Sequence, residues 1–193
     1  MFYIRKYTQS YWLKAQDIYA TGEISAEAVT RDLVAHKNTL SLWRIENLND
    51  LSKQKGFLAF LGSQDNLDTF DIIVFHESEL SGFDLFDNDG KTSLESYKSL
   101  HTDITNLRLS SLSKFAEIFS SKLYEEVEKK EELTGQIKKS KKDQDIARLK
   151  QELESLLIKR FTKKSIKDAI NDAIKEKLIS ENDLPPTFEK ILA

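Results

Sequence analysis

Helix-breaking residues are almost missing from the second half of this chain, and this gap constrains the fold more than any other feature. Between Lys91 and Leu184 the only glycine or proline is Gly135, and the two prolines of the chain are the adjacent Pro185 and Pro186. The same stretch is rich in lysine, glutamate, leucine and isoleucine, which favour helix. The sequence therefore predicts that most of residues 91–184 is helical.

Apolar residues recur three and four positions apart along this stretch. We expect a long helix that Thr92 or Ser93 caps, and its apolar stripe includes Tyr97, His101 and Ile104. Gly135 is its natural end, although the pattern can continue into the lysines that follow. A final helix over residues 165–179 completes the chain.

A second helix, between the long one and the final one, carries an apolar seam with heptad-like 3-4 spacing. The seam consists of Ile146, Leu149, Leu153 and Leu156. The simplest geometry for two consecutive helices is an antiparallel hairpin that turns between Gly135 and Gln144. Whether this hairpin closes on itself or pairs with a second chain is left open by the pattern.

The first half of the chain predicts a mixture of strands and helices. We expect strands at residues 2–7, 39–45 and 70–76, a weaker strand at 82–86, and helices after Ser25 and over 48–61. Strand 39–45, helix 48–61 and strand 70–76 together predict a βαβ unit whose strands pair in parallel.

The expected fold class is therefore α+β or α/β. A small mixed sheet with the βαβ unit lies in the N-terminal half, followed by a long C-terminal helical hairpin and a terminal helix. We expect a mixed α/β domain over residues 1–115 and a helical arm over residues 116–193.

Composition narrows the class of protein. The chain has no cysteine, which excludes disulfides, thiolate metal sites and cysteine nucleophiles. It is 39% apolar and 32% charged, and its longest apolar run is five residues, far short of the ~18 that a membrane helix needs. A cytoplasmic protein of bacterial type, without membrane contact, is the expectation.

Motifs for enzyme chemistry are incomplete. Gly90-Lys91-Thr92 resembles the end of a phosphate-binding loop, but Leu85 stands where that loop needs a glycine. Asp87 and Asp89 resemble calcium-loop positions, but both anchoring carboxylates are missing. No two of His36, His76 and His101 have the spacing of a helical metal site. We therefore expect no metal and no cofactor.

Arg31 and His36 form an R-x4-H spacing with a polar residue directly after the arginine. This resembles the short motif of the HEPN ribonucleases. The resemblance implies metal-independent RNA cleavage, in which His36 serves in acid–base attack by the 2′-hydroxyl and Arg31 holds the phosphate. It covers six residues only, and that family is all-helical.

Basic residues are concentrated towards the C-terminal half. Residues 138–164 hold ten lysines and arginines against four acids, whereas the whole chain has a net charge of −3. Phosphates of nucleic acid could bind this segment, but Phe161 is its only aromatic residue, so base stacking is not indicated.

We predict a non-enzymatic interaction subunit or adaptor of a cytosolic complex, which contacts another protein or a second copy through its helical hairpin. The predicted contact residues are the seam Ile146, Leu149, Leu153 and Leu156, with Lys138, Lys139, Lys141 and Lys142 adding charge complementarity. The alternatives are a HEPN-like ribonuclease and a nucleic-acid-binding accessory protein that uses residues 138–164.

Overall fold

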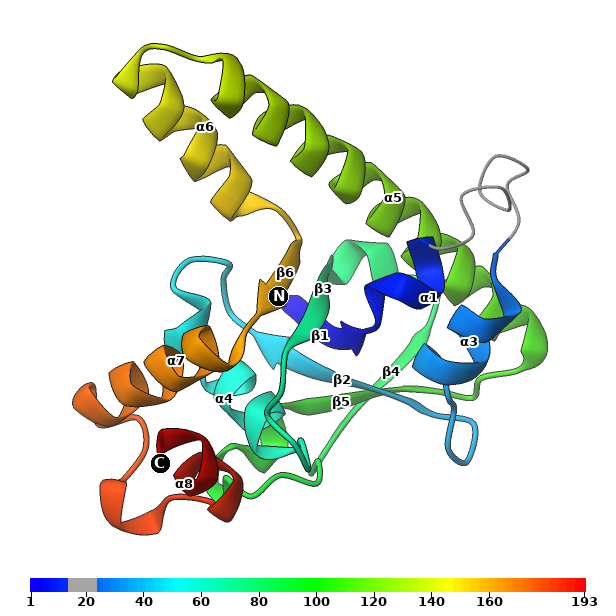
Figure 1. The fold of residues 1–193 in the computed structure, drawn as a ribbon. Coiled ribbons are helices and arrows are strands. Elements are labelled where there is room, and N and C mark those ends of the chain that lie inside the picture. The colour runs from blue at the N-terminus through cyan, green and yellow to red at the C-terminus, as the bar shows by residue number, and fades with distance from the viewer. Residues whose placement is uncertain (14–23) are drawn as a thin grey trace.

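A computed structural model describes residues 1–13 and 24–193, and it has the α+β fold (Figure 1). The strands are β1 (Phe2–Tyr7), β2 (Leu40–Ile45), β3 (Phe70–His76), β4 (Asp84–Asn88), β5 (His101–Thr105) and β6 (Ile158–Phe161). The helices are α1 (Gln9–Leu13), α3 (Ala26–Asp32), α4 (Lys55–Gly62), α5 (Leu109–Lys139), α6 (Asp143–Ser155), α7 (Lys163–Lys175) and α8 (Pro186–Leu192). Short 3-10 turns lie at Leu51–Lys53, Glu77–Leu80, Glu95–Leu100 and Glu181–Asp183.

The six strands form one sheet in the order β4-β5-β2-β1-β3-β6, and every neighbouring pair is antiparallel. The expected direct pairing of β2 with β3 is wrong, because β1 lies between them. Ile4 pairs with Trp43 of β2 on one side and with Val74 of β3 on the other. The unit β2–α4–β3 therefore exists with two strands that point the same way, but the N-terminal strand separates them.

Helices cover both faces of the sheet, so that residues pointing to either side of the central strand β3 are buried. Ile72 and Val74 of β3 face the side that α4, α7 and α8 cover, whereas Ile73 and Phe75 face the side that α1, α3 and α5 cover. Six of the seven residues of β3 are buried. This double coverage explains why β3 is an almost uninterrupted apolar run, as the sequence indicated.

Residues 92–108 are the main correction to the expected helix. The Thr92 hydroxyl donates to the carbonyl of Ala59 at 2.8 Å, and the Ser93 hydroxyl donates to that of Gly62 at 2.9 Å. Both predicted caps thus satisfy the C-terminal carbonyls of α4 instead of starting a helix. His101 and Ile104 then lie on opposite faces of strand β5, and α5 begins only at Leu109.

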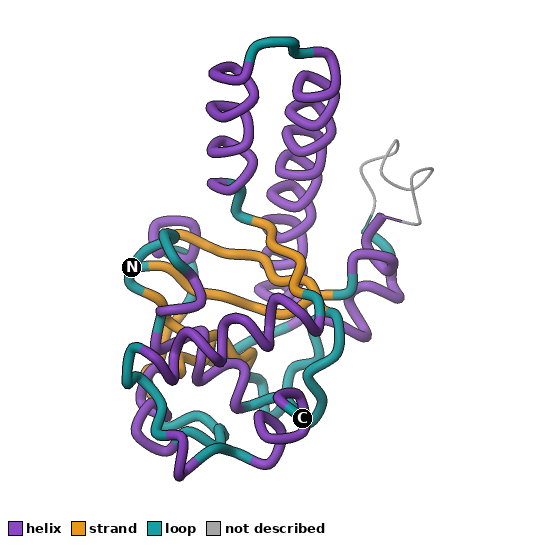
Figure 2. Tube along the Cα trace, turned by 60° about the vertical axis from the view of Figure 1, so that its left-hand side comes forward, coloured by secondary structure: helices purple, strands orange, loops and turns teal. Residues whose placement is uncertain are grey.

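The long helix and the hairpin follow the expectation further along the chain. α5 runs through Gly135 to Lys139, and α6 runs back beside it (Figure 2). Although α5 has 31 residues, no helix in the described part of the chain is long and apolar enough to cross a membrane.

The chain after the hairpin differs from the expected helical arm over 116–193. β6 pairs with β3 at the edge of the sheet, and α7 and α8 contribute to one of its two cores. Among the described helices and strands, the hairpin is therefore the part that projects from the body of the molecule (Figures 1 and 2). The rest of the C-terminal half belongs to the same packed unit as the N-terminal half.

Substitutions at two glycines test the packing of α4 and the continuity of α5, and they should change the free energy of unfolding in opposite directions. A Cβ on Gly56 of α4 would lie 1.6 Å from the carbonyl oxygen of Arg44, whereas a Cβ on Gly135 would meet nothing within 4 Å. We expect Gly56→Ala to lower the free energy of unfolding by about 1–3 kcal/mol or more, because α4 must move away from β2. Gly135→Ala is expected to raise it by about 0.5–1 kcal/mol, because this position is helical. Urea denaturation measures both, and a loss of stability in Gly135→Ala would contradict the continuous helix.

Candidate functional site

The hairpin of α5 and α6 is the structural feature that projects furthest from the sheet, and Figures 1 and 2 show its two helices side by side. Its apolar seam is used within the chain. Leu149 and Leu156 are 4% and 7% exposed, and Ile146 and Leu153 are half-buried. Leu149 and Leu156 are therefore covered within the single chain, where α6 lies against α5, and Leu156 directly follows the end of α6 at Ser155.

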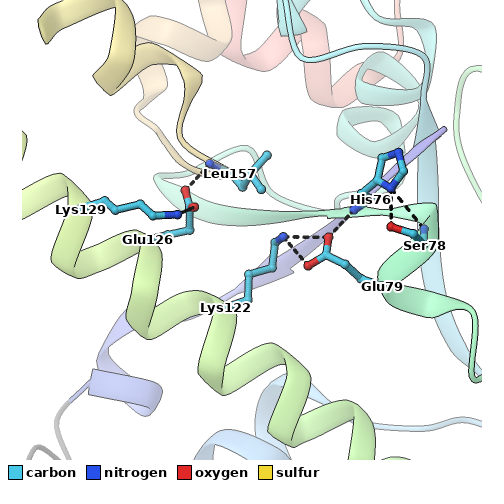
Figure 3. A network of polar contacts seen from close by, with 7 residues as sticks. All are labelled: His76, Ser78, Glu79, Lys122, Glu126, Lys129 and Leu157. Carbon is cyan, nitrogen blue, oxygen red and sulfur yellow. Dashed lines mark hydrogen bonds and ion pairs between the residues drawn. The ribbon is translucent and has the colours of Figure 1, made fainter.

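A buried lysine joins the lower part of α5 to the sheet (Figure 3). Lys122 is 9% exposed, and its ammonium group donates to both carboxylate oxygens of Glu79, at 2.6 and 2.8 Å. Glu79 also accepts the backbone N–H of His76 at 2.6 Å. This double use of one carboxylate fixes α5 to the end of β3, because a buried ammonium needs a charged partner.

A buried glutamate holds the point where the chain returns from the hairpin to the sheet. Glu126 is 5% exposed, and its carboxylate accepts the backbone N–H of Leu157 at 2.6 Å and the ammonium of Lys129 at 3.2 Å. The carbonyl of Leu157 accepts the N–H of Val74 in β3 at 2.8 Å. One residue, Leu157, therefore connects the hairpin, through Glu126, to the sheet, and Figure 3 shows Glu126 directed at it.

The tip of the hairpin is basic and solvent-exposed. Lys138 and Lys139 end α5, and Lys141 and Lys142 precede α6. All four are exposed, and no ion pair involves them in the described part of the chain. Asp143 and Asp145 follow in the first turn of α6, where carboxylates favour the helix N-terminus. The tip therefore presents positive charge that no group in the described chain neutralises at contact distance.

Arg31 and His36, the residues of the ribonuclease-like motif, lie near the end of α3 and in the segment that follows it. Arg31 forms an ion pair with Glu27 at 3.3 Å and lies 5.2 Å from the ring of Tyr11. α3 ends at Asp32, and His36 stands at a tight turn that it closes with Thr39. The two residues therefore do not share a helix.

The acidic residues at the end of β4 and directly after it have a structural use. Asp87 accepts the hydroxyl of Thr102 at 2.6 Å and pairs with Arg44, and Asp89 pairs with Lys98 at 3.3 Å. Among the described residues, no three histidine, aspartate or glutamate side chains come together as metal ligands would. These carboxylates are engaged with cations and hydroxyls of the chain itself.

The residues that fasten the hairpin, Lys122, Glu126 and Glu79, were not predicted from the sequence. Charged residues on a helix are normally read as solvent-exposed, and Lys122 and Glu126 break that rule because Glu79 and the backbone N–H of Leu157 provide them with partners. One signal was available: Lys122 and Glu126 flank Leu123 on the side where α5 packs on the sheet. Position on the packed face of a helix marks a charged residue as a candidate for burial.

Removal of the Glu126 carboxylate tests this fastening. Glu126→Ala leaves the N–H of Leu157 without its acceptor, and we expect the free energy of unfolding to fall by about 1–3 kcal/mol. Glu126→Gln keeps an oxygen acceptor and should lose less. The matched control is Glu125→Ala, an exposed neighbour on the same helix, which should stay within about 0.5 kcal/mol of the wild type. Equal urea midpoints for the two alanine variants would show that the contact does not hold the hairpin.

His101 lies in β5, next to the edge strand β4, and its burial can be tested through the pH dependence of stability. Its ring contacts Asn88 and packs edge-on against Trp43 at 5.0 Å. Burial lowers the pKa of His101, Asp103 partly opposes this shift, and Arg44 adds to it. Below the unfolded pKa near 6.5 the unfolded chain therefore binds a proton that the folded chain resists, so stability is present above that pH and is lost as the pH falls through it.

We expect the wild type to lose more stability than His101→Gln between about pH 7.5 and about pH 5.5. His36→Gln, a change at an exposed histidine, should follow the wild type. Urea denaturation at the two pH values measures the difference. If His101→Gln has the same pH dependence as the wild type, the buried neutral imidazole is not the cause.

Comparison with known proteins adds no relative of this chain. No protein-family model matches it, and neither the curated proteins nor the solved structures contain a significant match. The hairpin, its buried fastening and its basic tip are therefore the features from which a function can be inferred.

Proposed function

We propose that the protein is a non-enzymatic interaction subunit, which binds an acidic surface of another protein with the tip of its helical hairpin. The observation that carries this proposal is the group of four exposed lysines at the tip, none of which has an ion-pair partner in the described chain. Unpaired surface charge of one sign favours association with a surface of the opposite sign and speeds the encounter.

The construction of the hairpin supports a docking role. The projecting part of α5 and the whole of α6 cover no strand, as Figure 1 illustrates, so the sheet does not need them for its core. Their inner faces bury Leu149 and Leu156, and Lys122 and Glu126 anchor the base. A hairpin whose two helices pack on each other and whose base is fixed presents its tip in a defined position, which lowers the entropy cost of binding.

The distribution of charge favours a protein partner over nucleic acid. The fold divides the basic segment 138–164, because Lys138 to Lys142 lie at the tip, whereas Lys159 to Lys164 lie where the chain has returned to the sheet. Phe161, the only aromatic residue of the segment, packs against Phe57 and Phe70 with ring centroids 4.7 and 5.5 Å apart. It is therefore engaged in the core and is not a stacking platform for bases.

Neutralisation of the tip tests the proposal. The variant carries Lys138→Gln, Lys139→Gln, Lys141→Gln and Lys142→Gln, and its matched control carries Lys53→Gln, Lys55→Gln, Lys91→Gln and Lys175→Gln on the exposed surface of the body. Both lose the same charge. In quantitative affinity purification from the native host, we expect a partner that the wild type and the control retain and the tip variant loses at least tenfold.

The retained partner should dissociate as the salt concentration rises from about 0.05 to about 0.5 M, because exposed charge pairs are screened. Nuclease treatment should not release it. Equal recovery by the tip variant and the wild type would contradict the proposal, and so would a partner that nuclease removes.

A further inference from the structure

A lysine-lined pocket lies between the start of α7, helix α8 and the loop before β3, away from the hairpin. Its volume is about 310 Å³. The lining contains four lysines and one carboxylate, that of Asp65. The lysines are Lys163, Lys164, Lys167 and Lys190. Figure 1 shows α7 and α8 adjacent to each other, far from the hairpin tip.

Two of the four lysines are engaged, and two are not. Lys163 binds Asp68 at 2.8 Å, and Lys167 donates to the carbonyl of Leu192 at 2.5 Å. Lys164 and Lys190 are exposed, and the described part of the chain provides neither a hydrogen bond nor an ion pair for their ammonium groups. The pocket therefore keeps two ammonium groups available, which is the chemistry that attracts a phosphate.

An unsatisfied hydroxyl in the same wall is a separate indication of a ligand. The Oγ1 atom of Thr187 is buried and has no hydrogen-bond partner in the described structure. A buried hydroxyl without a partner is unfavourable, and such groups in native proteins usually have a reason. Thr187 also lines the pocket, and because its hydroxyl oxygen is shielded in the free protein, a rotation of this side chain would bring the hydroxyl within reach of a ligand oxygen.

We propose that this pocket binds a small organic phosphate. Lys164 and Lys190 would hold the phosphate oxygens, the Thr187 hydroxyl would donate to one ligand oxygen, and Leu67 and Ile191 would contact the organic part. A volume of about 310 Å³ is at the lower end of the range for small-molecule sites, roughly 300–1,000 Å³, so it accommodates one small ligand and not a length of polymer. This site is independent of the hairpin and of the function proposed for it.

Isothermal titration calorimetry with phenyl phosphate and with inorganic phosphate tests the proposal on the full chain. We expect saturable binding of phenyl phosphate, several-fold tighter than that of inorganic phosphate because of the apolar wall. Lys164→Gln with Lys190→Gln should weaken it at least tenfold. The control, Lys91→Gln with Lys175→Gln, removes the same charge elsewhere and should leave the affinity unchanged.

A second variant separates the hydroxyl from the charge. Thr187→Val should weaken phenyl phosphate binding while it leaves the urea midpoint unchanged or slightly raised, because the hydroxyl has no partner to lose in the free protein. Absence of saturable binding would overturn the proposal, as would equal weakening in the lysine control. Equal affinity for the two phosphates would overturn the assignment of an organic ligand.

Discussion

The hydrogen bond from the backbone N–H of Leu157 to the buried carboxylate of Glu126 holds the chain where it returns from the hairpin to the sheet. A helix that leaves the sheet must be followed by a segment that rejoins it, and the first peptide of that segment has to satisfy its N–H away from water. Glu126 accepts this N–H, while the carbonyl of the same residue continues the ladder to β3. The position of β6 at the sheet edge, and that of α7 after it, depends on this connection.

This connection explains why one sheet serves two halves of the sequence. β3 receives β1 on one side and β6 on the other, so strands that are more than eighty residues apart along the chain share its two edges. Each face of β3 then supports one core, α5 on one side and α7 with α8 on the other. The hairpin is the segment that this topology leaves outside the sheet.

Local patterns predicted the elements whose burial follows from their own residues. Strand 2–7 and strand 70–76 are apolar or aromatic runs, and the helical hairpin has apolar residues three and four positions apart, as their structures require. The patterns were wrong where the partner of a residue is distant in the sequence. Thr92 and Ser93 were predicted to cap a helix, but their hydroxyls bind the carbonyls that end α4. The pairing of β2 and β3 also could not be read from the βαβ pattern, because nothing in those residues shows that β1 inserts between them.

Only part of the candidate site could be predicted from the sequence, again because local patterns do not show distant partners. The tip lysines and the seam of α6 are visible as local charge and spacing. The burial of Lys122 and Glu126 depends on Glu79 and Leu157, which are 43 and 31 residues away from them, respectively. The packed face of α5 marks Lys122 and Glu126 as candidates for burial, but no local pattern identifies these distant partners.

The central claim is that α6 is part of the folded molecule, held by its packing on α5 and by the return of the chain at Leu157. Hydrogen exchange followed by mass spectrometry over residues 143–157 tests it most directly. An isolated helix of 13 residues is marginal in water, so amides of α6 are protected only if the helix is packed. We predict protection across this segment at least a hundredfold above that of an unfolded peptide. Exchange at the rate of an unstructured chain would contradict the rigid hairpin, and with it the docking role of the tip.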